Sequence, residues 1–296
     1  MLMKQESLFI HAGHHQLHLR HIYKVKGGAP ILMLHGSIEN GKIFYTEKGK
    51  GLGCYLADQG FDVFIADFRG KGKSLPPIHE DTNHGQFEMI TQDVPELLQY
   101  VHDKTGKKVH LICHSWGGVI LASSLIRKPH LADLISSKLC FGTKRSIRIK
   151  SFEKFIKLDL LWNKLLPHIA RKTGYVNAEK LKFGADSETL SFLQQSSQWI
   201  NKGEWQDPVD KYDYIGQVSQ VNWPATWHIT GIKDSLLGNV HDVRGFIDEY
   251  NKDSKFNLLS KENGNKLDYD HINILTHPEA INDHFPDIVD WLNKHT

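Results

Sequence analysis

Ser115 is the residue of this 296-residue chain whose surroundings most clearly indicate chemistry. It lies in residues 107–120, KKVHLICHSWGGVI, where a β-branched run leads into small residues and then a helix-forming stretch. This pattern predicts a strand, a sharp turn and a helix, with the serine at the tip of the turn. Small neighbours let the backbone pass close to itself, so the hydroxyl points outward as a nucleophile, as in a G-x-S-x-G turn. Cys113 takes the place of the first glycine, which makes the turn more crowded without preventing it.

Two further residues could activate such a serine, because serine hydrolysis needs a base to take the proton and an acid to orient the base. Asp234 lies in the turn 231–235, GIKDS, directly after an apolar, strand-like run. His271 lies in the loop 268–275, DYDHINIL, ahead of the last helical segment. Serine, aspartate and histidine therefore follow one another in an order known for such triads, each after a predicted strand.

Each of these residues has a plainer alternative role. The serine could only cap a helix and Asp234 could only serve a turn, although the small neighbours of the serine favour a nucleophile. Residues 142–145, GTKR, follow the preceding strand and contain no carboxylate, which strengthens Asp234 as the acid. The chain has 19 histidines, so a histidine alone indicates little. Position favours His271 over its neighbours His277 and His284.

Backbone amides are expected to stabilise the negative oxygen that forms when a serine attacks a carbonyl group. One is the amide of Trp116, at the start of the helix that follows the serine. The other is the amide of Ser37, in the turn after His35 and Gly36. The alternative for the second segment is a tight turn with no role in the reaction.

The elements that must position these residues alternate between strands and helices. Strand-like runs occur at residues 8–10, 17–23, 30–34, 61–67, 109–112, 134–141, 225–230 and 256–260, and helical patterns at 51–59, 89–103, 240–250 and 280–294. This alternation predicts an α/β fold, with a mostly parallel, eight-stranded sheet covered by helices on both faces. Residues 144–222, hereafter the insertion, read as mostly helical, so the core is expected to comprise residues 1–143 and 223–296.

Composition limits the classes of partner. Hydrophobic residues make up 40% of the chain and charged residues 24%, as in a soluble globular protein. The net charge of +2 is too small to indicate nucleic acid as a partner. Three cysteines without paired spacing, together with the lack of a signal-like or membrane-spanning stretch, lead us to expect a reduced compartment, the cytoplasm. The sequence says nothing about the oligomeric state.

Five motifs together carry a resemblance to a known family. They are LHGS at 34–37, DFRGKGKS at 67–74, CHSWGG at 113–118, GIKDS at 231–235 and DYDHINIL at 268–275. The chain resembles the α/β-hydrolase superfamily over nearly its whole length outside the insertion. The histidine loop looks most like that of serine esterases and lipases, including the acid-lipase-like branch. The resemblance also implies that Asp67 and Arg69 hold loops together without taking part in the reaction.

The resemblance implies a serine hydrolase that cleaves carboxylic esters of a small or lipid-like apolar substrate through an acyl-enzyme, with Ser115, Asp234 and His271 as the triad. Neither a metal nor an organic cofactor is expected. A serine nucleophile argues against haloalkane dehalogenases and epoxide hydrolases, which use a carboxylate, and against the cysteine-dependent dienelactone hydrolases and polyester synthases. An acyltransferase or thioesterase with the same triad is the alternative. A non-catalytic binding protein is disfavoured because all three residues are present.

The insertion occupies the place where this family builds a helical cap. Its aromatic residues could line an apolar pocket or form the small core of the cap: Trp162, Tyr175, Phe183, Phe192, Trp199 and Trp205. Residues 146–172 form a basic amphipathic pattern, which is typical of a lid helix with a solvated face and less often of a weak contact with a membrane surface.

Five histidines near the N-terminus raise the question of a metal site: His11, His14, His15, His18 and His21. Their spacing forms no defined ligand set, and neither carboxylates nor cysteines lie nearby in the sequence. Solvated faces of a hairpin are therefore the expectation, and no metal site is predicted.

Overall fold

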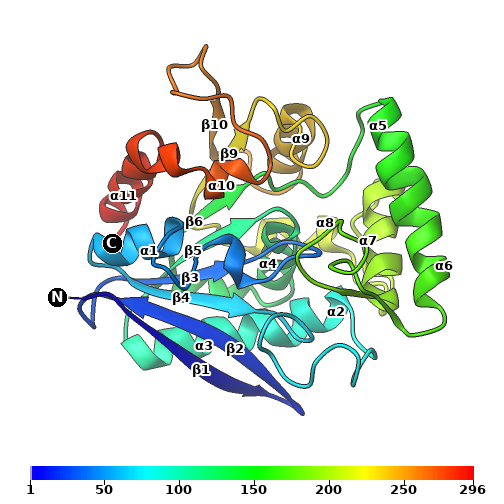
Figure 1. Cartoon of the computed structure of the whole chain (residues 1–296), viewed down its shortest axis with the longest axis horizontal. Coiled ribbons are helices and arrows are strands. Elements are labelled where there is room, and N and C mark those ends of the chain that lie inside the picture. Colours follow the sequence, from blue (N-terminus) through cyan, green and yellow to red (C-terminus); the bar gives the residue numbers. More distant parts are fainter. Residues whose placement is uncertain (1) are drawn as a thin grey trace.

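One eight-stranded sheet forms the centre of the protein, in a computed structural model that describes residues 2–296 apart from the side chain at position 202 (Figure 1). Its order is β1-β2-β4-β3-β5-β6-β9-β10. The strands are β1 (Lys4–Ala12), β2 (His15–Tyr23), β3 (Pro30–Leu34), β4 (Asp62–Asp67), β5 (Val109–His114), β6 (Ile135–Phe141), β9 (Ala225–Gly231) and β10 (Lys255–Leu259). Only the β1–β2 and β2–β4 pairs of this sheet are antiparallel, which confirms the expected mostly parallel sheet.

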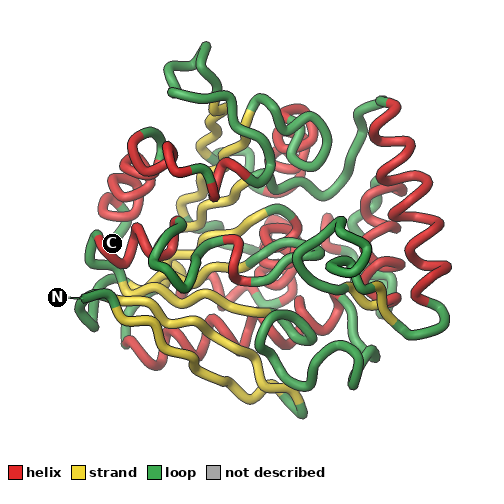
Figure 2. Tube along the Cα trace, in the orientation of Figure 1, coloured by secondary structure: helices red, strands yellow, loops and turns green. Residues whose placement is uncertain are grey.

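Helices cover both faces of this sheet, as the sequence predicts (Figure 2). The longer ones are α1 (Leu52–Asp58), α3 (Val94–Thr105), α4 (Trp116–Arg127), α9 (Val240–Tyr250) and α11 (Phe285–Lys294). In β3, Leu32 and Leu34 join a core with α3, α4 and α9, whereas Ile31 and Met33 join a second core with α1 and α11. This alternation follows from the two-residue period of a strand.

Short helical turns connect these elements. They are η1 (Gly41–Ile43), α2 (Gln86–Glu88), η2 (Met89–Asp93), η3 (Pro129–Leu134), α10 (Asn273–Thr276) and η6 (Pro278–Asn282). The single helix expected over residues 280–294 is therefore wrong in its first part, because η6 ends at Asn282 and α11 begins only at Phe285. Pro286 lies in the first turn of α11 and prevents the helix from extending backwards, and buried His284 between the two elements donates from Nε2 to the carbonyl oxygen of Ile274 (2.8 Å).

Helices cover about half of the insertion, less than expected, and the insertion lies at one side of the sheet (Figure 1). It contains α5 (Phe152–Lys154), η4 (Phe155–Leu165), α6 (Leu166–Ala170), β7 (Tyr175–Val176), β8 (Glu188–Thr189), α7 (Leu190–Lys202), α8 (Tyr214–Gln217) and η5 (Val218–Gln220). The first three form one continuous helix, which starts at Phe152 and not at residue 146. Ser151 caps it by accepting the amide of Lys154 (3.0 Å). The β7–β8 ladder has two residues per strand, too few to produce a sequence pattern.

The expectation that the N-terminal histidines lie on solvated hairpin faces is wrong for three of the five. His15, His18 and His21 are buried, whereas His11 and His14 are exposed. The reason for His18 and His21 is that β2 is an interior strand there, paired with β1 on one side and β4 on the other, whereas His15 packs against His84 in the loop that follows β4. No helix in residues 2–296 has both the length and the apolar character needed to cross a bilayer.

Candidate active site

Ser115 lies on a strained turn between β5 and α4. Its φ of 50° and ψ of −124° are unusual for a residue with a side chain. Three glycines allow this turn to sit close to its neighbours. A Cβ on Gly117 would lie only 2.4 Å from the carbonyl oxygen of His35. A Cβ on Gly118 would lie 2.5 Å from Thr143 Oγ1, and a Cβ on Gly36 would lie 2.9 Å from the Cβ of Ser115. The expected strand, turn and helix are therefore present, with Cys113 tolerated because it lies inside β5.

His271 and Asp234 are directly linked, as the sequence predicts. His271 Nδ1 lies 2.5 Å from Asp234 Oδ2, and both side chains are buried. The second oxygen of Asp234 accepts the amide of Gly238 at 2.7 Å. Gly142, at φ 55°, borders the imidazole, since a Cβ there would lie 2.9 Å from its Cε1 and Nδ1 atoms. Because a carboxylate only accepts, Nδ1 of His271 donates and Nε2 is free to act as a base.

The environment sets the charges of this pair. Burial alone would raise the pKa of Asp234, but His271 and the nearby Lys144 hold it below its ordinary value. Burial lowers the pKa of His271 although Asp234 acts in the opposite sense, and His114 and Lys144 lower it further. At neutral pH the pair therefore consists of a carboxylate and a neutral imidazole, as a general base requires.

Four of the five predicted site residues border one cavity of about 680 Å³: Ser115, His271, Ser37 and Trp116. Asp234 lies behind His271. Within residues 2–296, the backbone amides of Ser37 and Trp116 have no hydrogen-bond acceptor, so both are available to a ligand.

The two rival histidines lie elsewhere. His277 accepts the amide of Glu279 (3.1 Å) at the start of η6, and His284 is bonded to Ile274. His277 therefore caps the short turn η6 and not the last helix, α11, and neither histidine contacts Asp234 within 4.0 Å in the described chain.

Sequence reasoning missed two residues next to this site, Glu39 and His114. His114 Nδ1 lies 2.8 Å from Glu39 Oε2, and the same oxygen accepts the amide of Gly36 (2.9 Å). His114 Nε2 lies 2.9 Å from the carbonyl oxygen of His271. Both residues are buried. The available signal in the sequence was weak. Glu39 lies just after the predicted turn that bears Ser37, and His114 directly precedes Ser115.

Comparison with known proteins decides the family. The sequence model of the α/β hydrolase fold matches residues 29–226, which is more than half of the chain. The chain belongs to the α/β-hydrolase family. Its fold is similar to that of a soluble variant of monoglyceride lipase from Saccharomyces cerevisiae, with a TM-score of 0.69 and 16% identity over 99% of this chain and 96% of that one. It is also similar to the monoacylglycerol lipase of Paleococcus ferrophilus, with a TM-score of 0.59 and 16% identity over 95% and 99% of the two chains.

Several curated relatives of this α/β-hydrolase are lipases. Triacylglycerol lipase 1 of Arabidopsis thaliana is 27% identical over 121 residues, 38% of this chain and 30% of the relative. The human lysosomal acid lipase/cholesteryl ester hydrolase is 29% identical over 139 residues, 44% of this chain and 35% of the relative. The matches therefore span about a third of each relative's length.

The cavity of this α/β-hydrolase is lined by the insertion together with loops at the carboxyl ends of the strands. Most of its wall is apolar: Ile38, Ile43, Ile147, Leu158, Leu161, Trp162, Phe183, Ile200 and Leu237. Some aromatic residues of the insertion therefore line the cavity, and others form the core of the insertion. Trp162 and Phe183 line the cavity, whereas Phe192, Trp199 and Trp205 are buried in the adjoining core. Tyr175, in β7, lines no part of this cavity.

Three lysines border this largely apolar cavity, and of these only Lys144 is buried, whereas Lys42 and Lys157 are exposed. No carboxylate of the described chain lies within 4.0 Å of the Lys144 ammonium group. Burial lowers the pKa of Lys144 to about 8, although the charges of Asp234, Asp242 and Glu39 act in the opposite sense. Lys144 is therefore mostly charged at neutral pH. Without a direct contact, its charge lowers the pKa of Asp234 and the pKa of His271.

Asp67 and Arg69 hold loops together, as the family resemblance implies. Asp67 accepts the amides of Gly41 (2.8 Å) and Lys73 (3.0 Å) and pairs with His18 (2.8 Å). Arg69 donates from Nε to buried Asp93 (2.8 Å). None of these residues lines the cavity.

Proposed function

We propose that this α/β-hydrolase is a serine hydrolase of carboxylic esters, with Ser115 as nucleophile, His271 as general base and Asp234 as its orienting acid. The observation that carries the proposal is the 2.5 Å contact between His271 and Asp234 beside a serine held at positive φ on the same cavity. Such a constellation activates a hydroxyl that is unreactive by itself.

The reaction follows from this arrangement. His271 Nε2 takes the proton of the Ser115 hydroxyl as its oxygen attacks the ester carbonyl. The amides of Ser37 and Trp116 stabilise the negative oxygen of the tetrahedral intermediate. His271 then gives the proton to the departing alcohol, which leaves an acyl-enzyme. Water, deprotonated by His271, attacks this ester in turn and releases the acid and the free serine. Asp234 stabilises the imidazolium in both halves of the reaction.

The cavity suggests the kind of ester. Its volume of about 680 Å³ and its apolar wall suit a small or lipid-like substrate. We assign the insertion, residues 144–222, as a cap over a core formed by residues 1–143 and 223–296. The cytoplasm is the proposed compartment, in keeping with three buried cysteines that are all free.

Weak contact with a membrane surface through the cap belongs to the same proposal. The helix from Phe152 to Ala170 exposes six apolar side chains: Phe152, Phe155, Ile156, Leu160, Leu165 and Ile169. Lysines lie between them, including Lys154, Lys157 and Lys164. A helix with exposed apolar and basic side chains suits the interface of an anionic bilayer, where a lipid-like ester would be found.

The decisive experiment replaces Ser115 with alanine and measures hydrolysis of p-nitrophenyl esters together with labelling by a fluorophosphonate. We expect both signals to disappear, whereas Ser235→Ala, at an exposed serine beside Asp234, keeps them. Full activity of the Ser115→Ala variant would exclude this mechanism, and absence of labelling in the wild type would favour a non-catalytic protein. Preferential transfer of the acyl group to an added alcohol or thiol would favour an acyltransferase, and preference for thioesters a thioesterase.

A further inference from the structure

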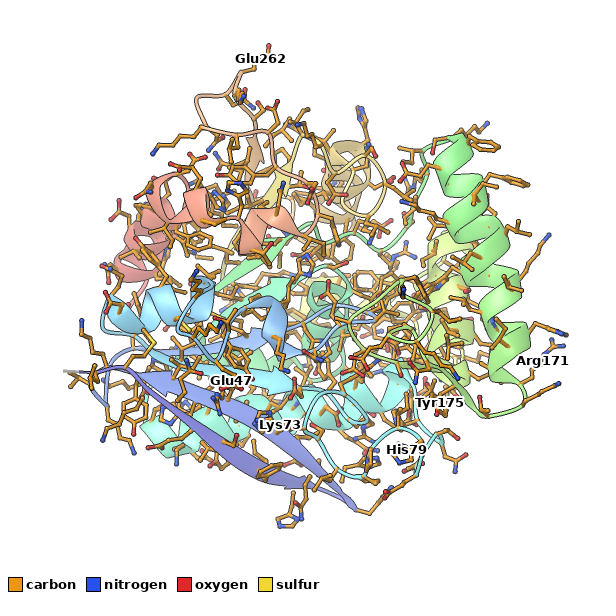
Figure 3. The ribbon with its side chains drawn as sticks, in the orientation of Figure 1. Glu47, Lys73, His79, Arg171, Tyr175 and Glu262 are labelled. Atoms are coloured by element: carbon orange, nitrogen blue, oxygen red, sulfur yellow. The ribbon has the colours of Figure 1, made fainter. Side chains whose placement is uncertain are left out.

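We propose that His14, His15 and Asp81 form a binding site for a divalent transition metal ion, most simply Zn²⁺, at the tip of the β1–β2 hairpin. The three side chains come from two segments, the hairpin turn and the loop that follows β4. None of them lines the cavity that holds Ser115, so this site is independent of the proposed ester hydrolysis. Figure 3 labels His79 in the same loop, at the edge of the molecule where the hairpin ends.

The spacing of the ligand atoms suits a tetrahedral ion. His14 Nε2 lies 3.0 Å and His15 Nε2 3.3 Å from Asp81 Oδ2, and one ligand atom from each residue lies within 4.8 Å of the others. With bonds of about 2.0–2.1 Å, ligands of tetrahedral Zn²⁺ are roughly 3.3 Å apart. The two imidazole nitrogens lie no more than 4.8 Å apart, so any adjustment is a small movement of one imidazole. His14 can provide this movement because its side chain is 75% exposed. A water molecule would complete the four ligands.

His15 supplies the independent observation that points to a ligand. Its side chain is only 1% exposed, yet neither ring nitrogen has a hydrogen-bond partner within the described chain. Its contact with Asp81 is close in distance but lacks hydrogen-bond geometry. Buried polar atoms nearly always have a partner. A metal ion at Nε2 would provide one.

The loop is already attached to the hairpin next to the site. Gln16, the neighbour of His15, exchanges two backbone hydrogen bonds with Leu75, at 2.7 and 2.9 Å. His84 is a second buried histidine whose ring nitrogens have no hydrogen-bond partner in residues 2–296, and it packs edge-on against His15 with ring centroids 5.6 Å apart. The ligands are thus held near their final positions before an ion arrives, which lowers the ordering cost of binding.

The charges of the site also suit a cation. The site offers two imidazoles and one carboxylate, all of which are ligand types of Zn²⁺. Two cations close to the site, Arg69 and Lys71, are each paired with a buried carboxylate, Asp93 and Glu188. Two imidazoles favour Zn²⁺ and similar ions over Mg²⁺ or Ca²⁺.

The expected effect is on stability. The ion would connect the hairpin to the loop that leads into α2, where Gln86 accepts the indole N–H of Trp116 (3.0 Å). A ligand that binds only the folded state raises Tm, here by about 5 °C at a hundredfold excess over Kd.

The test is calorimetric titration of chelator-treated protein with Zn²⁺, with the absorption of bound Co²⁺ as the spectroscopic readout. We expect one saturable site per chain, a tetrahedral Co²⁺ spectrum and a rise in Tm. His14→Ala and Asp81→Asn are expected to weaken binding at least about tenfold. Since His14 is exposed, the His14→Ala variant is expected to fold normally. The Tm of the metal-free variant, compared with that of the metal-free wild type, checks this.

Matched controls are His11→Ala and His79→Ala, which remove exposed histidines outside the cluster and are expected to leave binding unchanged. Absence of saturable binding, or wild-type affinity in both ligand variants, overturns the proposal. An equal loss of affinity in the controls overturns it as well, since it would indicate an adventitious ion only. Ester hydrolysis by Ser115 is measured separately, so failure of this site leaves the proposed function untouched.

Discussion

His114 Nε2 donates a hydrogen bond to the backbone carbonyl oxygen of His271 across 2.9 Å. Its Nδ1 donates to Glu39 at 2.8 Å, because a carboxylate and a carbonyl can both only accept. His114 is therefore an imidazolium. Burial opposes this charge, but Glu39 raises the pKa of His114, and His114 in turn lowers the pKa of Glu39 to about 2 although burial acts against it. The buried pair joins the turn that bears Ser37 to the loop that bears His271.

Replacing His114 with alanine is expected to reduce both stability and turnover. Glu39 would remain as a buried charge without its partner, which costs about 3–5 kcal/mol of the free energy of unfolding. The His271 loop would lose its anchor, and a displacement near 1 Å can lower kcat about a hundredfold. Thermal unfolding and steady-state kinetics measure the two effects. His130→Ala, at an exposed histidine in η3, is the control. Wild-type kcat in a folded His114→Ala variant would contradict the positioning role.

Gly142→Ala is expected to damage activity more than stability. A Cβ at this position would lie 2.9 Å from the His271 ring and 3.3 Å from Asp234 Oδ2, so the imidazole must move. We expect a loss of kcat/KM of about a hundredfold. Gly106→Ala is the control for backbone strain without a steric contact. Gly106 also has a positive φ (66°), but a Cβ there would meet nothing within 4 Å. Both variants should lose about 1–2 kcal/mol of stability from the strained backbone. Equal activity of the two variants would show that the space beside the imidazole does not matter.

The pH dependence of kcat/KM should report His271. Only its neutral form can act as a base, so kcat/KM falls as the pH drops through the pKa of His271 in the free enzyme. Burial lowers this pKa, so the midpoint is expected below 6.5, with a plateau at neutral pH.

Lys144→Met is expected to move this acidic limb to higher pH, because Lys144 is one of the charges that lower the pKa of His271. Lys42→Met, at an exposed lysine that also borders the cavity, should leave the midpoint unchanged. Initial rates across a pH series for the three proteins give the comparison. A midpoint that moves to lower pH in Lys144→Met would contradict the expected influence of the lysine charge on His271.

Membrane contact through the cap predicts binding to anionic vesicles. Phe152→Ser combined with Ile156→Ser removes two exposed apolar side chains and is expected to reduce co-sedimentation at least about tenfold, in line with the apolar area lost. Val209→Ser, at an exposed residue of the insertion outside this helix, is the matched control. Equal binding of all proteins, or no binding by the wild type, would exclude the contact. Ester hydrolysis in solution should be unaffected by these changes.

Local patterns predicted much of this protein. The small residues around Ser115 indicated the turn because only small side chains allow a backbone to pass so close to itself, and Gly117 shows this at 2.4 Å from His35. The interior strand β3 was visible because it is apolar along its whole length, as both of its faces are covered. The break at Asp283 before α11 was missed, although Pro286 indicates it. A proline in the first turn of a helix prevents the helix from continuing back toward Asn282.

The sequence by itself determined which residue types lie at the ends of which strands, and in what order. The tertiary structure decided which of 19 histidines meets Asp234, and it paired Glu39 with His114 and His14 with Asp81. It also buried His15, which the hairpin pattern places at the surface. The physical reason is that strand and turn preferences act between near neighbours, whereas burial and ion pairing depend on which distant segments the folded sheet brings together.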